Sequence, residues 1–278
     1  MPKIKFSLLS IIGGLTLLSS SAYAGVDAEV SYILNTLLFL IGGFLVMWMA
    51  AGFAMLESGL VTSKSVATIA AKNIGLYSIA GLVFWLVGYN LAYGIPEGGF
   101  IGSFIPWSDA SSVDTGYSDG SDWFFQMVFC ATTCSIVSGT LAERIKIWPF
   151  FLFCAILAGV IYPIEMGWQW GGGHLAAAGF SDFAGSTLVH SAGAAAALAG
   201  ALLLGPRLGR FTDSGEAAPM APFASSSIPL ATLGVFILWM GWFGFNGGSQ
   251  LAMGSFDDST AVATIFINTN LAACAGVM

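Results

Sequence analysis

The chain has 278 residues, of which 56% are hydrophobic and only 8% charged, and its formal net charge is −7. A soluble domain of this length could not hide so much apolar surface from water. The composition therefore excludes a soluble globular protein and indicates an all-α polytopic membrane protein.

The first 24 residues have the composition of a secretory signal peptide. Lys3 and Lys5 precede an apolar core from Phe6 to Leu18, and the small-residue pattern Ala22-Tyr23-Ala24 follows it. This order of basic, apolar and small residues predicts cleavage after Ala24. Residues 1–24 are accordingly set apart from the fold.

Apolar runs long enough to cross a bilayer, which takes about 20 residues, recur along the rest of the chain. Six complete spans are expected, at Val30–Leu56, Ala67–Tyr93, Trp123–Leu141, Pro149–Ile164, Gly185–Leu204 and Ile228–Phe245. A seventh run begins near Ser259 and is still apolar at Met278. We interpret the chain as truncated within or just after this seventh span.

The basic residues outside the signal peptide all fall in loops, or near span ends, that would lie on one side of the membrane. They are Lys64, Lys72, Arg144, Lys146, Arg207 and Arg210. Because cytoplasmic loops carry an excess of Lys and Arg, this distribution predicts a multi-pass protein of the inner (plasma) membrane with its mature N-terminus outside.

Acidic residues gather in the long loop predicted after the second span, on the outer side. They are Glu97, Asp109, Asp114, Asp119 and Asp122. Two interpretations stay open: the carboxylates simply solvate the loop, or they modestly concentrate cations at the outer surface.

Two later segments repeat the first two spans. GGFLVMWM at 42–49 aligns with LGVFILWM at 233–240, and VATI occurs at Val66 and again at Val262. Because five spans separate the copies, they would cross the membrane in opposite senses, as in inverted-repeat transporters. This predicts a first five-helix repeat over 25–227 and the start of a second over 228–278, with a pathway between them.

His190 is the single ionisable residue between Asp182 and Arg207, inside a run of Gly, Ala and Leu. Such a residue is costly in lipid and usually faces a functional cavity. Neutral imidazole can accept a proton on one nitrogen and donate from the other, so it can line a path for a small polar molecule. The alternative is a histidine hydrogen-bonded to a neighbouring helix.

Several motifs make the chain resemble the ammonium transporter family, relatives of the Rh glycoproteins. They are AGFAMLESG at 51–59, FFQMVFCATT at 124–133, LAERIK at 141–146, WGGG at 170–173, DFAGSTLVHSAGAAAALAGALLLGPR at 182–207 and GWFGFNGGS at 241–249. The resemblance implies an ammonium transporter fold with inverted five-helix repeats and eleven spans, about seven of them present here. It also implies a homotrimer with one pore in each subunit.

The resemblance also implies the site. Phe129, Trp170 and Ser249 would recruit ammonium at the outer mouth, Phe129 and Phe245 would form a stacked gate, and His190 would be the first of two pore histidines, the second lying beyond Met278. Aromatic faces attract a cation by about 0.5 to 2 kcal/mol. A bare ion costs on the order of 20 kcal/mol to bring into hydrocarbon by the Born estimate, against about 2 to 7 for a neutral polar group.

Two further residues receive an interpretation. Asp182 is expected to begin the fifth helix, where its carboxylate would cap free backbone N–H groups and meet the positive end of the helix dipole. The family resemblance adds a second role, in attracting or deprotonating ammonium. His174, in the predicted outer loop, is expected to be solvated.

The resulting hypothesis is a transporter that captures ammonium, deprotonates it and conducts ammonia. No enzymatic activity, cofactor, metal site or nucleic-acid partner is expected. One alternative is an ammonium sensor that uses the same binding site, and another is a membrane enzyme or electron carrier with His190 as a haem ligand. The resemblance suggests a PII-type signalling protein as a partner, docking on the face that carries Arg144, Lys146 and Arg207.

Overall fold

The computed structural model describes residues 26–212, 214–217, 219 and 223–278. The expected signal peptide, residues 1–24, lies outside this range. Within it, seven helices are long and apolar enough to span a membrane, which confirms the all-α polytopic fold. They run over Ala28–Leu60, Ser63–Tyr93, Asp119–Leu141, Ile147–Gly167, Ser186–Leu204, Ile228–Gly248 and Phe256–Val277.

The first, third, sixth and seventh spans are the single helices α2 (Ala28–Leu60), α5 (Asp119–Leu141), α10 (Ile228–Gly248) and α11 (Phe256–Val277). The other three contain π-helical turns. Residues Phe84–Gly88 join α3 (Val66–Val83) to α4 (Tyr89–Tyr93), Leu157–Ile161 join α6 (Ile147–Ile156) to α7 (Tyr162–Gly167), and Ser186–Ser191 precede α9 (Ala192–Leu204). Single π turns inside helices are frequent at functional sites.

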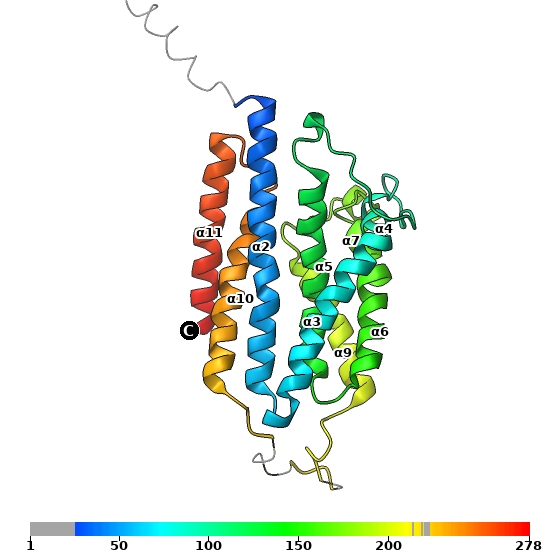
Figure 1. Ribbon diagram of the computed structural model, residues 1–278, viewed down its shortest axis with the longest axis vertical. Helices are drawn as coiled ribbons and strands as arrows, with labels where there is room; N and C mark the ends of the chain where they lie inside the picture. Colours follow the sequence, from blue (N-terminus) through cyan, green and yellow to red (C-terminus); the bar gives the residue numbers. More distant parts are fainter. Residues whose placement is uncertain (1–25, 213, 218, 220–222) are drawn as a thin grey trace, which may run out of the picture.

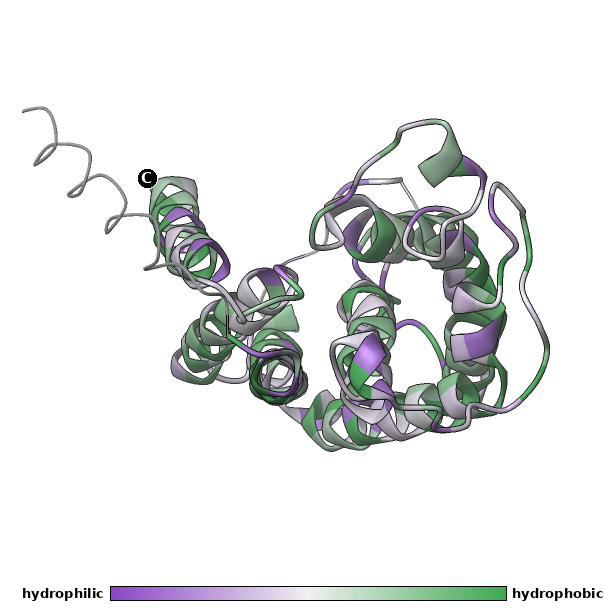
Figure 2. Ribbon diagram, turned by 90° about the horizontal axis from the view of Figure 1, so that it is seen from above, coloured by the Kyte–Doolittle hydropathy of each residue, from purple (hydrophilic) through white to green (hydrophobic). Residues whose placement is uncertain are grey.

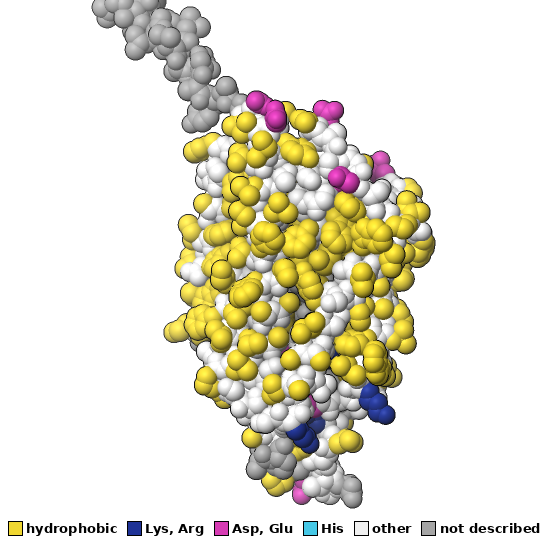
Figure 3. All heavy atoms as spheres, viewed as in Figure 1, with side chains coloured by type: hydrophobic (Ala, Val, Ile, Leu, Met, Phe, Trp, Pro, Cys, Tyr) yellow, Lys and Arg dark blue, Asp and Glu magenta, His cyan; other side chains and the backbone are white. Residues whose placement is uncertain are grey.

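The helices stand side by side along one direction (Figure 1). Apolar side chains dominate the middle of the face in Figure 3, with most of the visible carboxylates towards the upper end and Lys and Arg, beside a few carboxylates, at the lower end. We call these the acidic end, where α5 begins and α10 ends, and the basic end, where α2 ends and α10 begins. An apolar belt between polar ends is what a bilayer requires. Which end faces the cytoplasm stays a prediction.

Helices α2 and α10 pack against each other in antiparallel directions, with their backbones in close approach. A Cβ on Gly52 would lie 3.1 Å from the Gly234 carbonyl oxygen, and one on Gly59 only 2.5 Å from the backbone nitrogen of Ala231. Small residues allow such contact in membranes, where packing rather than hydrophobicity drives association. These helices open the two repeats expected from the sequence, and the boundary between 227 and 228 stays a prediction.

Helix α5 is the most buried of the spans, with 78% of its apolar window inside the molecule. It packs against α2, α3 and α9. By contrast, α11 lies at the edge of the bundle (Figure 2) and is 11% buried. The central position of α5 places Phe129 in the interior of the bundle.

Candidate functional site

Phe129, Trp170 and Ser249, which the sequence resemblance grouped, line a single cavity of about 230 Å³ at the acidic end. Phe129 comes from the middle of α5, Trp170 from the turn between α7 and the short helix α8 (His174–Ala177), and Ser249 from the end of α10. The rings of Phe129 and Trp170 meet edge to face, with centroids 5.9 Å apart. We call this space the mouth cavity.

The hydroxyl of Ser249 donates to the Phe245 backbone carbonyl at 2.8 Å, which is a bond within its own helix. Its one proton is therefore already engaged, and the remaining lone pairs are free to accept. Ser249 thus presents an acceptor, as an N–H donor requires.

Phe129 lines the mouth cavity, and the ring of Phe245 packs against it. Their ring centroids are 4.1 Å apart and their planes meet at 38°, so the pair is in contact but tilted rather than stacked in parallel. Each side chain is 1% exposed. Phe125, one turn before Phe129, packs edge to face on it with centroids 4.8 Å apart. The rings together form a buried apolar contact, which we call the constriction.

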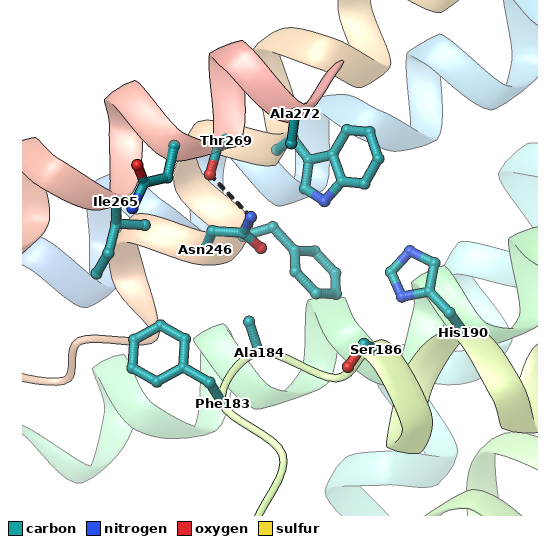
Figure 4. Close-up of a pocket in the computed structure, with 11 residues that line it drawn as sticks. Phe183, Ala184, Ser186, His190, Asn246, Ile265, Thr269 and Ala272 are labelled. Atoms are coloured by element: carbon teal, nitrogen blue, oxygen red, sulfur yellow. Dashed lines mark hydrogen bonds between the residues drawn. The ribbon is translucent and has the colours of Figure 1, made fainter. Parts of the chain in front are cut away.

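His190 lies beyond this constriction. Its ring centroid is 5.4 Å from that of Phe245, and both residues line a second cavity of about 550 Å³, which we call the histidine cavity. In Figure 4, Ser186 and His190 lie towards one side of this cavity, while Asn246 and Thr269 lie towards another and are joined by a hydrogen bond of 2.9 Å.

The tautomer of His190 follows from its hydrogen bond. The Nδ1 atom is 3.0 Å from the backbone carbonyl oxygen of Gly185. Because a carbonyl can only accept, Nδ1 carries the proton, and in a neutral ring Nε2 is left as an acceptor. The π-helical turn that contains His190 also directs its backbone N–H to Gly185, at 3.0 Å.

Asp182 organises the start of this helix. The helix begins at Ser186, four residues later than the aspartate expected to start it. The carboxylate nonetheless accepts backbone N–H bonds of 2.8 to 3.1 Å from Gly185, Ser186, Thr187 and Leu188. Burial alone would raise the pKa of Asp182, but these four donors outweigh it and lower that pKa below its ordinary value. Both oxygens are engaged, which favours the capping role.

Gly185 must be glycine for this turn to form. Its φ is +89°, a conformation that residues with a side chain rarely adopt, and a Cβ there would lie 2.6 Å from Val189 Cγ2. The Trp170 indole closes the same turn from outside, since Nε1 donates to the Asp182 carbonyl at 2.7 Å.

Asp122 is a residue whose setting the sequence analysis missed. It was expected in the outer loop, but it lies in the first turn of α5, is 6% exposed and lines the mouth cavity. Its carboxylate accepts from Tyr89 Oη at 2.5 Å and from Gln126 Nε2 at 3.3 Å. Among the residues that the structure describes, no Lys or Arg lines the mouth cavity.

A sequence signal for Asp122 was available. Asp122, Gln126 and Phe129 stand at helical positions i, i+4 and i+7, so they share one face of α5. At 1.5 Å per residue, Asp122 lies about 10 Å before Phe129 along the helix axis. A carboxyl group therefore lies before the aromatic constriction.

His174 also differs from expectation, because it is not simply solvated. Its ring stacks on Phe100 with centroids 4.2 Å apart and meets Trp168 edge to face at 4.9 Å. Its Nδ1 atom is buried without a hydrogen-bond partner. The Gly-rich turn before α8 is hydrogen-bonded to the loop that follows α4, and this contact places the His174 ring against Phe100. The local sequence does not reveal this contact.

Comparison with known proteins supports one family. The sequence profile of the Ammonium Transporter Family matches residues 37–278. Ammonium transporter Amt2 of Archaeoglobus fulgidus is 43% identical over 249 residues, which cover 86% of this chain and 51% of that protein. The chain belongs to the ammonium transporter family.

Solved structures of the family have the same fold. A structure described as a sensor Amt protein superposes with a TM-score of 0.80 at 36% identity, covering 89% of this chain and 61% of that one. Mep2 of Candida albicans gives a TM-score of 0.69 at 27% identity, covering 82% and 51%. The chain spans about half the length of the curated relatives it matches.

Proposed function

We propose that the protein is a transporter that recruits ammonium in the mouth cavity, deprotonates it and conducts ammonia past Phe129 and Phe245 to His190. The observation that carries this proposal is the continuous contact of Trp170, Phe129, Phe245 and His190 between two cavities. Membership of the ammonium transporter family supports the substrate.

The mouth cavity has the chemistry of a monovalent cation site. Asp122 supplies a negative charge, the rings of Phe129 and Trp170 supply π faces, and Ser249 supplies an acceptor for an N–H donor. The tilted pair Phe129 and Phe245 then excludes hydrated ions. Ammonium loses its water and one proton, the proton returns to the water of the mouth, and ammonia passes.

The cost of dehydration explains why the neutral species passes. A charge in a dry constriction costs on the order of 20 kcal/mol by the Born estimate, and a neutral polar group about 2 to 7. Beyond the rings, His190 Nε2 accepts a hydrogen bond from ammonia, because its Nδ1 proton is held by Gly185. The histidine therefore binds ammonia without adding a permanent charge.

Uptake by the full-length protein in proteoliposomes tests this function. We expect saturable methylammonium uptake that ammonium inhibits by competition. Na⁺ and K⁺ should not inhibit it. Protein-containing vesicles that take up no more methylammonium than protein-free vesicles would contradict it. In the assembled protein we propose a homotrimer with the basic end facing the cytoplasm, where a PII-type signalling protein docks.

A second candidate is an ammonium sensor that uses the same mouth cavity. The superposition on a structure described as a sensor Amt protein favours it. A sensor would bind ammonium in the mouth cavity with the same dependence on Asp122 and Trp170, yet show no uptake in vesicles. Binding measured by calorimetry beside the uptake assay separates the two functions.

A further inference from the structure

Glu57 is a buried carboxylate near the basic end of α2, and one of its oxygens is crowded with donors. The side chain is 5% exposed. Its Oε2 atom lies 3.2 Å from Lys72 Nζ, and it accepts from Ser138 Oγ at 2.9 Å and from Asn73 Nδ2 at 3.3 Å. Lys72 also donates to the Ser138 backbone carbonyl at 2.6 Å. Helices α2, α3 and α5 thus meet at a neutral ion pair.

The other oxygen, Oε1, is buried and has no hydrogen-bond partner. A carboxylate oxygen accepts about two hydrogen bonds, and a buried acceptor left unpaired is destabilising. Such an atom calls for a donor that the described side chains do not provide. Because Lys72 already balances the charge, the missing donor need not be a cation.

Glu57 lines a third cavity, of about 510 Å³, at the basic end. The other charged groups on its wall are engaged: Arg207 pairs with Glu143 at 2.6 Å, and Arg144 donates to the Gly205 carbonyl at 3.2 Å. We call it the basic-end cavity. Its charges balance except for Arg144, so the wall disfavours a cation.

A glycine lies beside Oε1. Gly139 of α5 lines the same cavity, and a Cβ there would lie 3.8 Å from Oε1, with no closer contact than 3.6 Å to Glu57 Cγ. Ten residues separate Gly139 from Phe129, which is about 15 Å along the helix axis. Gly139 and Oε1 therefore lie on the far side of the constriction, towards the basic end.

We propose that Glu57 Oε1 is an acceptor site for ammonia in the basic-end cavity, where it binds the neutral N–H donor after His190 on the way out of the pore. The inference rests on the proposed transport function and adds a binding site to it. Lys72 and Ser138 hold the carboxylate in place through Oε2 and leave the buried Oε1 without a donor, and Gly139 has no side chain to block the approach to it.

The first test fills the space without altering any charge. In Gly139→Ala, the new methyl group meets Glu57 at ordinary contact distance and covers Oε1, while the ion pair with Lys72 stays intact. We expect the maximal rate of methylammonium uptake by the full-length protein to fall about three- to tenfold, with half-saturation at the mouth unchanged. Gly81→Ala is the matched control, because a Cβ there meets only Met127 Sδ at 3.8 Å.

An uptake rate in Gly139→Ala equal to that of Gly81→Ala would overturn the acceptor site. This outcome differs from failure of the proposed function, in which the wild-type protein itself shows no uptake. The two ideas can therefore be rejected separately.

The second test observes the carboxylate directly by infrared difference spectroscopy of reconstituted protein with and without ammonium. We expect an ammonium-dependent shift of a carboxylate stretching band that is lost in Glu57→Gln and in Gly139→Ala. The band should persist in Glu143→Gln, because Glu143 lines the same cavity with both oxygens already bonded. If the ammonium-dependent band shift is unchanged in Glu57→Gln, the proposal is overturned. If Glu57→Gln does not fold, an unchanged band shift in Gly139→Ala overturns it.

Discussion

The indole Nε1–H of Trp170 donates to the backbone carbonyl of Asp182 at 2.7 Å, while the carboxylate of the same aspartate accepts four backbone N–H bonds from the turn that leads to His190. One residue therefore positions both a wall of the mouth cavity and the helix that carries the histidine. Perturbing it should affect the mouth and the pore together.

Asp182→Ala should lower the free energy of unfolding by about 2 kcal/mol, the upper end of the range for loss of a helix cap, because four backbone N–H groups, two of them buried, lose their acceptor. Asp182→Asn retains one acceptor oxygen and should lose less. Thermal unfolding of the purified full-length protein measures both. Equal stability of the alanine variant and the wild type would rule out the capping role.

Asp122→Asn should weaken recruitment at the mouth without stopping conduction. Removing the one carboxylate that lines this cavity should raise the half-saturation concentration for ammonium about tenfold, equivalent to ~1.4 kcal/mol, with the maximal rate little changed. Asp114→Asn is the control, since Asp114 lies in the exposed loop before α5. Uptake kinetics at low salt measure both variants, and equal half-saturation in the two would argue against Asp122.

Phe245→Ala should open the constriction. Loss of one ring from a pair 4.1 Å apart leaves a gap through which water can pass, so Na⁺ or K⁺ currents should appear in planar bilayers where the wild type shows none. The truncation should also cost about 3 to 5 kcal/mol of stability. Phe245→Leu keeps an apolar side chain in the constriction and should remain impermeable to ions. An alanine variant that conducts no ions would contradict a gate at this pair.

His190→Ala should abolish or strongly alter methylammonium uptake, because it removes the acceptor Nε2 from the histidine cavity. His190→Gln keeps a side chain that can both donate and accept, and should retain part of the activity. Uptake in vesicles, with folding checked by gel filtration, provides the measurement. If the alanine variant retains saturable, ammonium-selective uptake at an unchanged rate, His190 is not part of the pathway.

Glu143 gives a prediction about pH at the basic end. Burial alone would raise its pKa, but hydrogen bonds from Thr62, Arg207 and Ser65 outweigh burial and lower that pKa from 4.5 to about 2. A carboxyl whose pKa falls on folding stabilises the folded state above its unfolded pKa, and this contribution is lost as pH falls through the folded pKa. The stability difference between wild type and Glu143→Gln should therefore be constant above pH 4.5 and shrink towards pH 2. A difference independent of pH would contradict this account.

Hydropathy was sufficient to predict the seven spans, since a stretch of about 20 apolar residues has few stable positions outside a bilayer. Helix ends were less predictable. The first helix continues one turn beyond Leu56 to Leu60, and the fifth begins at Ser186 rather than at Asp182. Caps and π turns decide these ends, and both depend on backbone geometry.

The grouping of Phe129, Trp170, Ser249, Phe245 and His190 was accessible through family motifs and not through spacing, because the five residues come from four separate segments of the chain. The structure brings them into two adjoining cavities. Their roles in transport stay predictions that the variants above can test.

The sequence by itself determined that this chain spans a membrane, how many helices it contributes and which family it belongs to, because each of these depends on local composition and ordered motifs. Only the tertiary structure decided that Asp122 is buried beside Tyr89, that His174 packs between rings, and that one oxygen of Glu57 is left unpaired. The reason is physical: burial and hydrogen bonding of a side chain depend on what packs against it from segments distant in the chain.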